Sequence, residues 1–442
     1  MTATLAGPPA SPASGERLLS LEEALGRLLD GVETLPAEMA PLQESAGRVL
    51  AADVYADVAL PPWDNSAMDG FAVRAADVAE ATTGRSVRLR VTGEIAAGQV
   101  PRGDVAPGTA QRIMTGAPLP PGADAVVPIE DTSAWHEPRA GASTTSSDAV
   151  EVFRGAAVGE HLRHRGEDVE AGSKILRSGG RMSAGAVALA AAVGRDRVSV
   201  VRRPHLGLLA TGDEVVAPGQ PAGPGQIHDA NTAGLAVLAR RAGAVPRSFG
   251  IARDELGDVQ ERLAEALAWA DVVVVSGGVS VGARDVVKDA FDGLGSVDFW
   301  RVAVQPGKPL AFGRAERTGA PGPPVLLFGL PGNPVSSYVT FELFVRPAVR
   351  RLSGMSPHGR RVGRAVLAER AAKSPERRAF LRVRLEPGGE PGALPIARLS
   401  GGQGSHVVSA LAAAEALAVV PEGIAVAEAG TEVEVWPFED DV

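Results

Sequence analysis

The chain has 442 residues, no cysteine, and a formal net charge of -9. The absence of cysteine excludes disulfides, thiolate metal ligands and cysteine nucleophiles. The acidic balance disfavours nonspecific binding to nucleic acid or to anionic membranes. No apolar run reaches the roughly 18 residues of a membrane span, and the first residues lack a signal-peptide pattern. We therefore expect a cytoplasmic protein with about three domains, at roughly 150 residues per domain.

The first segments predict a tail followed by a helical region. Residues 1–16 are rich in Pro, Ala, Gly and Ser, so we expect a disordered tail. Ser20 and Glu23 form a capping box that opens an amphipathic helix over Leu21–Leu29. Two more helices are expected, over residues 44–52 and 183–193. We assign this helical and linker domain to residues 17–58 and 161–202.

Two stretches of the chain predict β domains. In each of them, short apolar runs alternate with Pro and Gly turns. The first stretch gives a small inserted β domain over residues 59–160, with strands at VRLRVTG, AQRIMTGA, ADAVVPIE and AVEVF. The second gives a C-terminal β domain over residues 354–442, with strands at RVGRAVLAE, AFLRVRLE, LPIARLS, LAVVPEG and TEVEVWPF.

Between these stretches, residues 203–353 alternate strands with helices. The expected strands are almost wholly apolar, which indicates a parallel sheet covered by helices on both faces. They lie at residues 205–210, 245–251, 271–276, 297–304 and 325–330. The fold class we predict is therefore a multidomain α/β plus β protein built around this central α/β domain.

Four loops follow strand ends in the α/β domain. In open parallel sheets, ligands bind beyond the carboxyl ends of the strands, and glycine turns let backbone N–H groups converge on an anion. One such loop alone could be a tight connection, but four together predict a site for a phosphorylated anion. Neither a dinucleotide fingerprint nor a P-loop is present. The loops are TGDE (211–214), SGGVSVG (276–282), PGKP (306–309) and PGNP (331–334).

Carboxylates accompany these loops, and Mg²⁺ would let them coexist with a bound phosphate. Some of them could instead cap helices, since Asp254 and Asp285 each precede one. We interpret Glu214, Asp254 and Asp285 as metal-binding or catalytic residues. Lys308, one of only four lysines in the chain, is held between glycine and proline, so we interpret it as functional.

Three further polar segments lie outside the α/β domain. They are DNSAMDG (64–70), RIMTGA (112–117) and RHRGED (163–168). Each segment taken alone is typical of a surface loop.

Taken together, these segments resemble the molybdopterin molybdenumtransferase family, known in bacteria as MoeA and related to the E domain of animal gephyrin. The resemblance covers the chain from about Leu18 to the C-terminus, and the strings occur in the order of the family. They are DNSAMDGFAV (64–73), RIMTGAPLPPGADAVV (112–127), RHRGEDV (163–169), LLATGDE (208–214), SGGVSVGARD (276–285), QPGKPLAFG (305–313) and GLPGNPVSS (329–337).

The resemblance implies an enzyme that inserts molybdate into adenylylated molybdopterin, with Mg²⁺-dependent release of AMP. It also implies a homodimer whose site lies between the α/β domain of one subunit and loops of the other. The implied partners include the adenylyltransferase and the recipient molybdoenzymes. Neither nucleic acid nor a membrane is expected as a partner.

The resemblance also assigns residues. The catalytic set is Asp69, Thr115, Glu214, Asp254 and Asp285, and Mg²⁺ would be held by Asp254 and Asp285. The substrate-binding set is Arg163, Asp168, Ser276, Gly277, Gly278, Ser280, Arg301, Lys308, Pro309, Pro331, Gly332, Asn333, Arg382 and Ser405. The sequence departs from the family at Arg301 and Gln305, where many relatives have lysine. Arg301 keeps the positive charge of lysine but presents it in a planar guanidinium. Whether the protein prefers molybdate or tungstate therefore stays open.

Two other functions stay open at this point. The α/β domain also resembles the adenylyltransferase of the neighbouring step, although that enzyme is typically a single domain. A non-catalytic cofactor carrier or scaffold is the second alternative, although the sequence has no long linker with partner motifs.

Overall fold

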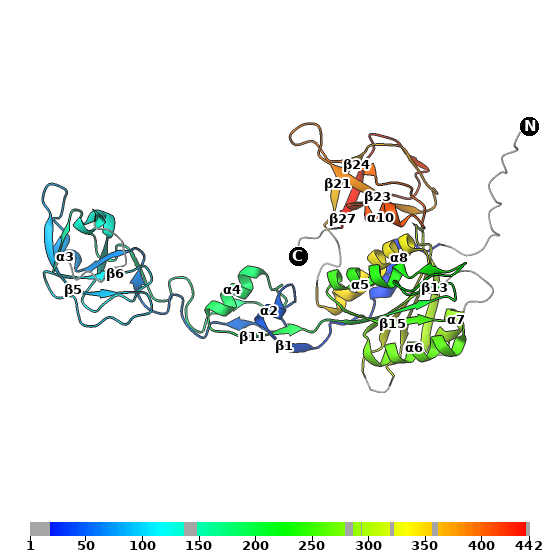
Figure 1. The fold of residues 1–442 in the computed structure, drawn as a ribbon, viewed down its shortest axis with the longest axis horizontal. Helices are drawn as coiled ribbons and strands as arrows, with labels where there is room; N and C mark the ends of the chain where they lie inside the picture. Colours follow the sequence, from blue (N-terminus) through cyan, green and yellow to red (C-terminus); the bar gives the residue numbers. More distant parts are fainter. Residues whose placement is uncertain are drawn as a thin grey trace, which may run out of the picture. The chain divides into compact units, whose positions relative to one another are not determined.

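The computed structural model describes six ranges, and the chain divides into two compact units, each described here by itself (Figure 1). The larger unit comprises Met1–Glu38, Gly47–Val49 and Val201–Val442, and the smaller one Met39–Ala46 and Leu50–Val200. The expected tail over residues 1–16 lies outside the described residues, as do Ser280 and Asp285. The described ranges are 18–136, 148–278, 286–292, 294–318, 322–355 and 361–438.

The larger unit is built around a six-stranded mixed sheet with the order β15-β12-β16-β20-β19-β17. The parallel arrangement is confirmed for the first four strands, but β19 runs antiparallel to both of its neighbours. The strand β19, which follows β17 through a short connection, was not expected from the sequence. Since β17 runs in the same direction as the parallel strands, the start of β19 lies at their carboxyl ends. The strands are β12 (His205–Thr211), β15 (Val245–Ala252), β16 (Val272–Ser276), β17 (Gly295–Arg301), β19 (Pro309–Ala315) and β20 (Val325–Leu330).

Helices cover both faces of this sheet, as the apolar strands predicted (Figure 1). Leu206 and Val272 face one core with α1, α5, α8 and α9, whereas Leu209 and Val273 face a second core with α6 and α7. The alternation follows from the two-residue period of a strand. The capping box of Ser20 at the start of α1 is also confirmed. The helices are α1 (Leu21–Leu29), α5 (Ala230–Ala242), α6 (Leu256–Trp269), α7 (Val286–Phe291), α8 (Pro334–Thr340), the π-helix η3 (Phe341–Val345) and α9 (Arg346–Leu352).

The C-terminal part of the larger unit is a small closed barrel. Its five long strands, all expected from the sequence, pair in the order β23-β24-β21-β27-β25, and β25 pairs back with β23. The short strand β18 (Val304–Gln305), between β17 and β19, adds to β23 and so joins the barrel to the α/β sheet. The barrel elements are β21 (Gly363–Leu367), β22 (Ala371–Ala372), β23 (Arg378–Glu386), β24 (Ile396–Leu399), α10 (Val408–Ala412), β25 (Ala416–Val420), β26 (Val426–Ala427) and β27 (Glu432–Pro437).

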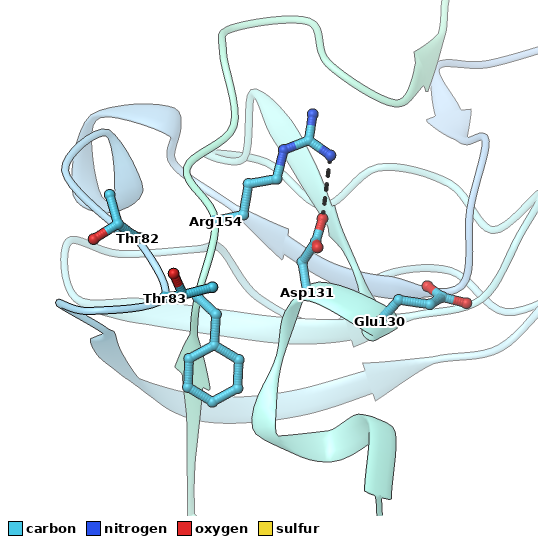
Figure 2. A pocket seen from close by; sticks show the side chains of 7 residues that line it. Thr82, Thr83, Glu130, Asp131 and Arg154 are labelled. Carbon is cyan, nitrogen blue, oxygen red and sulfur yellow. Dashed lines mark hydrogen bonds and ion pairs between the residues drawn. The ribbon is translucent and has the colours of Figure 1, made fainter.

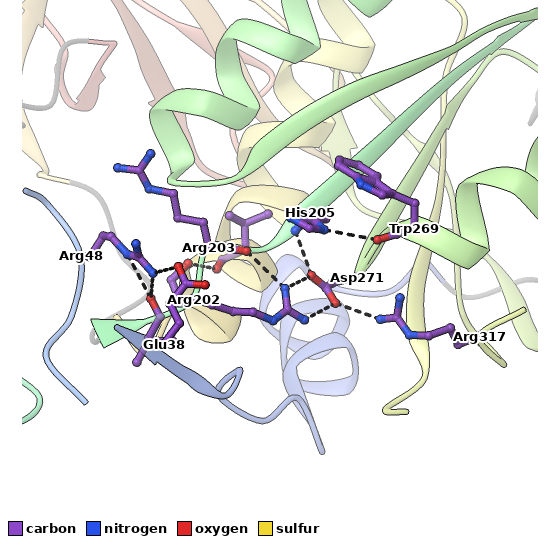
Figure 3. Close-up of polar contacts among 11 residues, drawn as sticks. Glu38, Arg48, Arg202, Arg203, His205, Trp269, Asp271 and Arg317 are labelled. Carbon is purple, nitrogen blue, oxygen red and sulfur yellow. Dashed lines mark hydrogen bonds and ion pairs between the residues drawn. The ribbon is translucent and has the colours of Figure 1, made fainter. Parts of the chain in front are cut away.

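Two five-residue strands, β1 (Ala37–Pro41) and β11 (Arg197–Val201), begin in one of these units and end in the other. The segment after β11 is fixed to the α/β sheet by a buried ion cluster (Figure 3). The Asp271 carboxylate accepts two hydrogen bonds of 2.7 Å from Arg202, one of 2.9 Å from Arg317 and one of 2.9 Å from the backbone N–H of His205. Burial raises the pKa of Asp271, but the hydrogen bonds from Arg202 and the His205 N–H outweigh it and hold the pKa below its usual value.

The smaller unit contains a five-stranded sheet with the order β7-β4-β6-β5-β8, which includes all four strands expected there. The helix expected over residues 44–52 is shorter, because Gly47 turns the chain with a φ of 76° after α2 (Leu42–Ser45). The remaining elements are β2 (Val54–Tyr55), β3 (Asn65–Ser66), β4 (Gly70–Val73), α3 (Ala75–Val78), β5 (Val87–Ile95), β6 (Thr109–Ile113), β7 (Ala125–Pro128), η1 (Ile129–Asp131), η2 (Ser133–His136), β8 (Ala149–Val152), β9 (Leu162–Arg163), β10 (Lys174–Leu176) and α4 (Ala184–Ala192).

Among the described residues, no helix has both the length and the apolar character needed to cross a membrane.

Candidate functional site

A pocket of about 790 Å³ opens at the carboxyl ends of β12, β16 and β20. Three of the four expected loops contribute several residues to it, and the fourth contributes Pro309. Two short strands, β13 (Val215–Val216) and β14 (Ile227–His228), lie in the segment between β12 and α5. The polar or glycine residues lining the pocket are Thr211, Gly212, Asp213, Glu214, His228, Asp229, Asn231, Asp254, Ser276, Gly277, Gly278, Gly332, Asn333 and Ser336.

The TGDE loop brings carboxylates together at the pocket. Gly212 has a φ of 135°, and a Cβ at this position would lie 2.6 Å from a carboxylate oxygen of Glu214. The Asp213 carboxylate accepts a 3.1 Å hydrogen bond from the backbone N–H of Asp254. Burial, followed by the negative charges of Asp213 and Glu214, raises the pKa of Asp254. The three side chains therefore form one acidic cluster.

The donor chemistry of this cluster fits a hard divalent cation. Carboxylate oxygens are the ligands that Mg²⁺ prefers, and a bound cation would relieve the repulsion that raises the pKa of Asp254. Within the described ranges, no three His, Cys, Asp or Glu side chains are already arranged as a metal site. Asp285, the second expected ligand, lies outside those ranges.

Two glycine turns meet at the neighbouring strand ends β16 and β20. Gly277 and Gly278 both have positive φ angles, of 103° and 64°. A Cβ on Gly332 would lie 3.7 Å from the Cα of Gly277, so the PGNP turn approaches the SGG turn closely. Ser276, at the end of β16, is only 4% exposed. The two turns thus expose backbone, with few side chains, to the pocket.

The PGNP turn also contacts the barrel. Asn231 donates a 2.8 Å hydrogen bond to the carbonyl of Gly332, and the Ser337 hydroxyl donates to the carbonyl of Pro331. The backbone N–H of Val335 donates to the carbonyl of Ser405 at 3.2 Å. The expected residue Ser405 therefore lies beside a pocket turn, although it does not line the pocket.

Arg382 lies beneath the same barrel loop. It is 1% exposed, and its Nη2 donates to the carbonyls of Gly402 at 3.0 Å and Gly404 at 3.1 Å. Burial lowers the pKa of Arg382 to about 10. In the described part of the chain, no carboxylate lies within ion-pair distance of this guanidinium. Arg382 therefore supports the loop that carries Ser405 and does not line the pocket.

The PGKP loop packs on α8. Gly307 has a φ of 103°, and a Cβ there would lie 2.4 Å from the Thr340 hydroxyl. Lys308 is partly buried, and its carbonyl accepts from the backbone N–H of Val302 at 2.9 Å. Arg301, also partly buried, lies opposite Pro309 in the β17–β19 pair. These three substrate-binding candidates therefore share one edge of the sheet.

Gln305, the second departure from the family pattern, has a structural contact. Its side-chain oxygen accepts a 3.3 Å hydrogen bond from the backbone N–H of Ser374 in the barrel. A lysine at this position could not accept that bond.

The remaining expected residues come together in the smaller unit. The Asp69 carboxylate accepts from both the N–H and the hydroxyl of Thr115, at 2.8 and 2.7 Å. Arg163 lies opposite Asn65 in the β3–β9 pair, and the N–H of Asp168 donates to the carbonyl of Leu60 at 3.0 Å. The three polar loops, far apart in sequence, thus form one surface of this unit.

The smaller unit also has a hollow of about 620 Å³ at another place (Figure 2). Arg154 pairs there with Asp131 at 3.4 Å and also with Glu160 at 3.3 Å, while Glu130 points away from the Arg154–Asp131 pair. The cation in this hollow already has two carboxylate partners, and none of the expected site residues lines it.

Among the lining residues, His228 and Asn231 were not expected from the sequence, and Thr211 was expected only as part of the TGDE loop. Asn231 carried one usable signal, because Asp229 already caps α5 and a second polar side chain in the first turn has no capping role. Thr211 carried the signal of its loop, whereas His228 carried none, since an isolated histidine is common in any fold.

Three family models match consecutive parts of the chain. They are described as MoeA N-terminal region (domain I and II), over residues 19–194, probable molybdopterin binding domain, over 207–351, and MoeA C-terminal region (domain IV), over 364–438.

Curated proteins and solved structures match this chain over nearly its whole length. A protein named molybdopterin molybdenumtransferase 2, from Mycobacterium tuberculosis, is 39% identical over 402 residues, covering 90% of this chain and 94% of its own. Molybdopterin molybdenumtransferase from Bacillus subtilis is 36% identical over 94% of this chain and 93% of its own. The crystal structure of a molybdopterin biosynthesis MoeA protein from Pyrococcus horikoshii matches with a TM-score of 0.75 and 32% identity, covering 96% of this chain and 100% of that one. The chain therefore belongs to the MoeA family of molybdopterin molybdenumtransferases.

Proposed function

We propose that this protein inserts molybdate into adenylylated molybdopterin and releases AMP, which yields the molybdenum cofactor. The observation that carries the proposal is the pocket at the strand ends of the domain that matches the molybdopterin-binding model. It combines glycine turns, which suit phosphate, with a carboxylate cluster, which suits a divalent cation.

The adenylylated substrate binds in this pocket. Backbone N–H groups of Gly278 and Gly332 bind its phosphates, while the N–H of Gly277 already donates to the carbonyl of Leu330 at 3.1 Å and holds the turn in place. Ser276 and Asn333 border the same turns. Asp254, together with Asp285, would hold Mg²⁺, and Glu214 completes the acidic wall. Bound Mg²⁺ would neutralise charge on the pyrophosphate. Pro309 and Pro331 stiffen the turns, and Ser280 supplies a further hydroxyl.

Molybdate, the second substrate, binds near the PGKP loop. Lys308 and Arg301 provide positive charge there, because both lie at the edge of the sheet where Pro309 reaches the pocket. Ser405 donates a further hydrogen bond to molybdate from the barrel loop, and Arg382 holds that loop through the carbonyls of Gly402 and Gly404. Charge-assisted hydrogen bonds of this kind suit a tetrahedral oxyanion.

The chemical step requires no covalent nucleophile from the protein. The bound molybdate attacks the adenylyl phosphorus, so that a new P–O bond forms as the anhydride P–O bond breaks and molybdopterin phosphate leaves. The two dithiolene thiols then replace the AMP oxygen and one oxo ligand on molybdenum, which forms two Mo–S bonds and releases AMP and one water. Positioning and electrostatic stabilisation supply most of the rate. The absence of cysteine agrees with this scheme.

The active protein is a homodimer in the cytoplasm, in this proposal. Asp69, Thr115, Arg163 and Asp168 then complete the pocket of the partner subunit. The acidic net charge of -9 supports a small-molecule substrate over nucleic acid.

The test is to mix the purified protein with adenylylated molybdopterin, Mg²⁺ and molybdate, and to measure AMP by chromatography. We expect molybdate-dependent AMP from the wild type and at least a hundredfold less from Asp254→Asn, a loss typical of a catalytic group. If the rate of AMP formation is the same with and without molybdate, the proposed molybdenumtransferase activity is refuted. ATP-dependent adenylylation of bare molybdopterin would favour the adenylyltransferase, and pterin binding without turnover would favour a carrier.

A further inference from the structure

Thr211 is a buried residue in the pocket wall with an unsatisfied hydroxyl. It ends β12, is 5% exposed and lines the pocket. Its Oγ1 has no hydrogen-bond partner among the described residues and is closed to solvent. Buried hydroxyls are nearly always paired, so an unpaired one needs a physical explanation.

The neighbours of this hydroxyl belong to the glycine turn. A Cβ on Gly277 would lie 2.8 Å from Thr211 Oγ1, and a Cβ on Gly278 would lie 3.3 Å from it. Only glycine therefore lets the turn pass so close to the threonine. The hydroxyl therefore lies beside the turn that lines the pocket.

Asn231 provides a second, independent observation. Its Nδ2 donates to the carbonyl of Gly332 at 2.8 Å, which fixes the amide orientation because a carbonyl can accept only from the NH₂ end. The other end, Oδ1, is buried without a partner in the described part of the chain. The pocket wall thus holds an unused hydroxyl donor and an unused amide acceptor.

We infer that Thr211 is a ligand-binding residue that donates a hydrogen bond to a phosphoryl oxygen at the Gly277–Gly278 turn, and that Asn231 Oδ1 accepts from an N–H of the same ligand. The inference rests on the proposed function, which supplies an adenylylated ligand with both groups. Because Oγ1 is closed to solvent, the hydroxyl reaches the ligand by rotation about Cα–Cβ to another staggered position.

The ligand class follows from the pair of unused groups. An inorganic oxyanion offers acceptors to Thr211 but has no N–H for Asn231. A nucleoside monophosphate such as AMP offers both. A phosphorylated pterin, the other half of the proposed substrate, offers both as well. The pocket therefore selects a phosphorylated heterocycle over a bare phosphate, and AMP serves as the probe of that class.

The first test uses Thr211→Val in the full-length protein, with AMP as the probe in calorimetric titration. Valine keeps the shape and removes the hydroxyl. We expect AMP affinity to fall about ten- to hundredfold, as for a hydrogen bond to a charged group, while the melting temperature stays equal or rises. Thr211→Ser keeps a hydroxyl and should restore AMP affinity to within about threefold of the wild type.

Thr340→Val is the matched control. The Thr340 hydroxyl is also buried and unpartnered within the described residues, but Thr340 does not line the pocket. This variant should gain stability in the same way and bind AMP as the wild type does. Asn231→Leu removes both the tether to Gly332 and the Oδ1 acceptor, so it should weaken AMP binding at least about tenfold more than it weakens the binding of inorganic phosphate.

Three outcomes would overturn the inference. Wild-type AMP affinity in Thr211→Val would remove the role of the hydroxyl, and so would a melting temperature several degrees lower, since the group would then be structural. If Asn231→Leu lowers the affinities for AMP and for phosphate by the same factor, Asn231 only positions Gly332 and does not bind the ligand through Oδ1. If the wild type releases AMP in a molybdate-dependent reaction while these variants behave normally, only this inference fails. If the wild type neither binds nor releases AMP, the proposed function fails as well.

Discussion

At the scale of single residues, the ionised Asp254 carboxylate lowers the stability of the folded protein, although the proposed site requires it. Its raised pKa means that the folded protein holds this proton more tightly than the unfolded chain, so stability falls as pH rises above the usual aspartate range and the penalty is complete at neutral pH. We predict that Asp254→Asn raises the melting temperature at pH 7 while it abolishes turnover. Mg²⁺ should stabilise the wild type and not the variant, as measured by calorimetry with and without the ion. A lower melting temperature for the variant would contradict this account.

Gly212 has a different role, because it makes room for the Glu214 carboxylate. We predict that Gly212→Ala lowers kcat/KM at least tenfold. The new Cβ would lie 2.6 Å from a carboxylate oxygen of Glu214 and would force that carboxylate to move. Gly225→Ala is the control for backbone strain: its φ is +81°, and nothing lies within 4 Å of a Cβ there. Both variants should lose similar stability, but only Gly212→Ala should lose activity in the AMP-release assay. Equal activities would mean that Glu214 tolerates displacement.

At the scale of secondary structure, the sequence predicted elements whose apolar period is clear. The strands of the barrel and the helix Leu21–Leu29 belong to this class, because alternation and capping are local signals. The strand β19 (Pro309–Ala315) was not predicted, since its first residue belongs to the PGKP loop and Gly313 ends its short apolar run. The SGG, TGDE and PGNP loops met as expected, because parallel strands bring their carboxyl ends to one edge. The contacts of the Arg382 guanidinium with the carbonyls of Gly402 and Gly404 could not be predicted, since they join segments distant in sequence.

The ion cluster around Asp271 fixes the segment that follows β11, and it predicts a pH dependence. Because the pKa of Asp271 is depressed, its stabilisation is complete above the usual aspartate pKa and is lost as pH falls through the lower folded value. We predict that Asp271→Asn costs about 3–5 kcal/mol at neutral pH, as expected when one partner of a buried ion pair is removed. Urea unfolding followed by the fluorescence of Trp269, close to this cluster, measures it (Figure 3). Asp131→Asn, at a more exposed pair, should cost less than about 1 kcal/mol.

At the scale of the whole molecule, the residues that the resemblance assigns to one site lie in both units, and the proposal places those of the smaller unit at the pocket of the partner subunit. On this proposal, Asp69→Asn and Asp254→Asn should complement each other. Each variant alone is expected to be inactive, but a mixed dimer has one pocket with both substitutions and one with neither. Random association makes about half of the dimers mixed, so a coexpressed mixture should recover about a quarter of wild-type AMP release. No recovery in a mixture that is dimeric by size-exclusion chromatography would instead assign both residues to one chain's own site, since each chain would then still lack one of them.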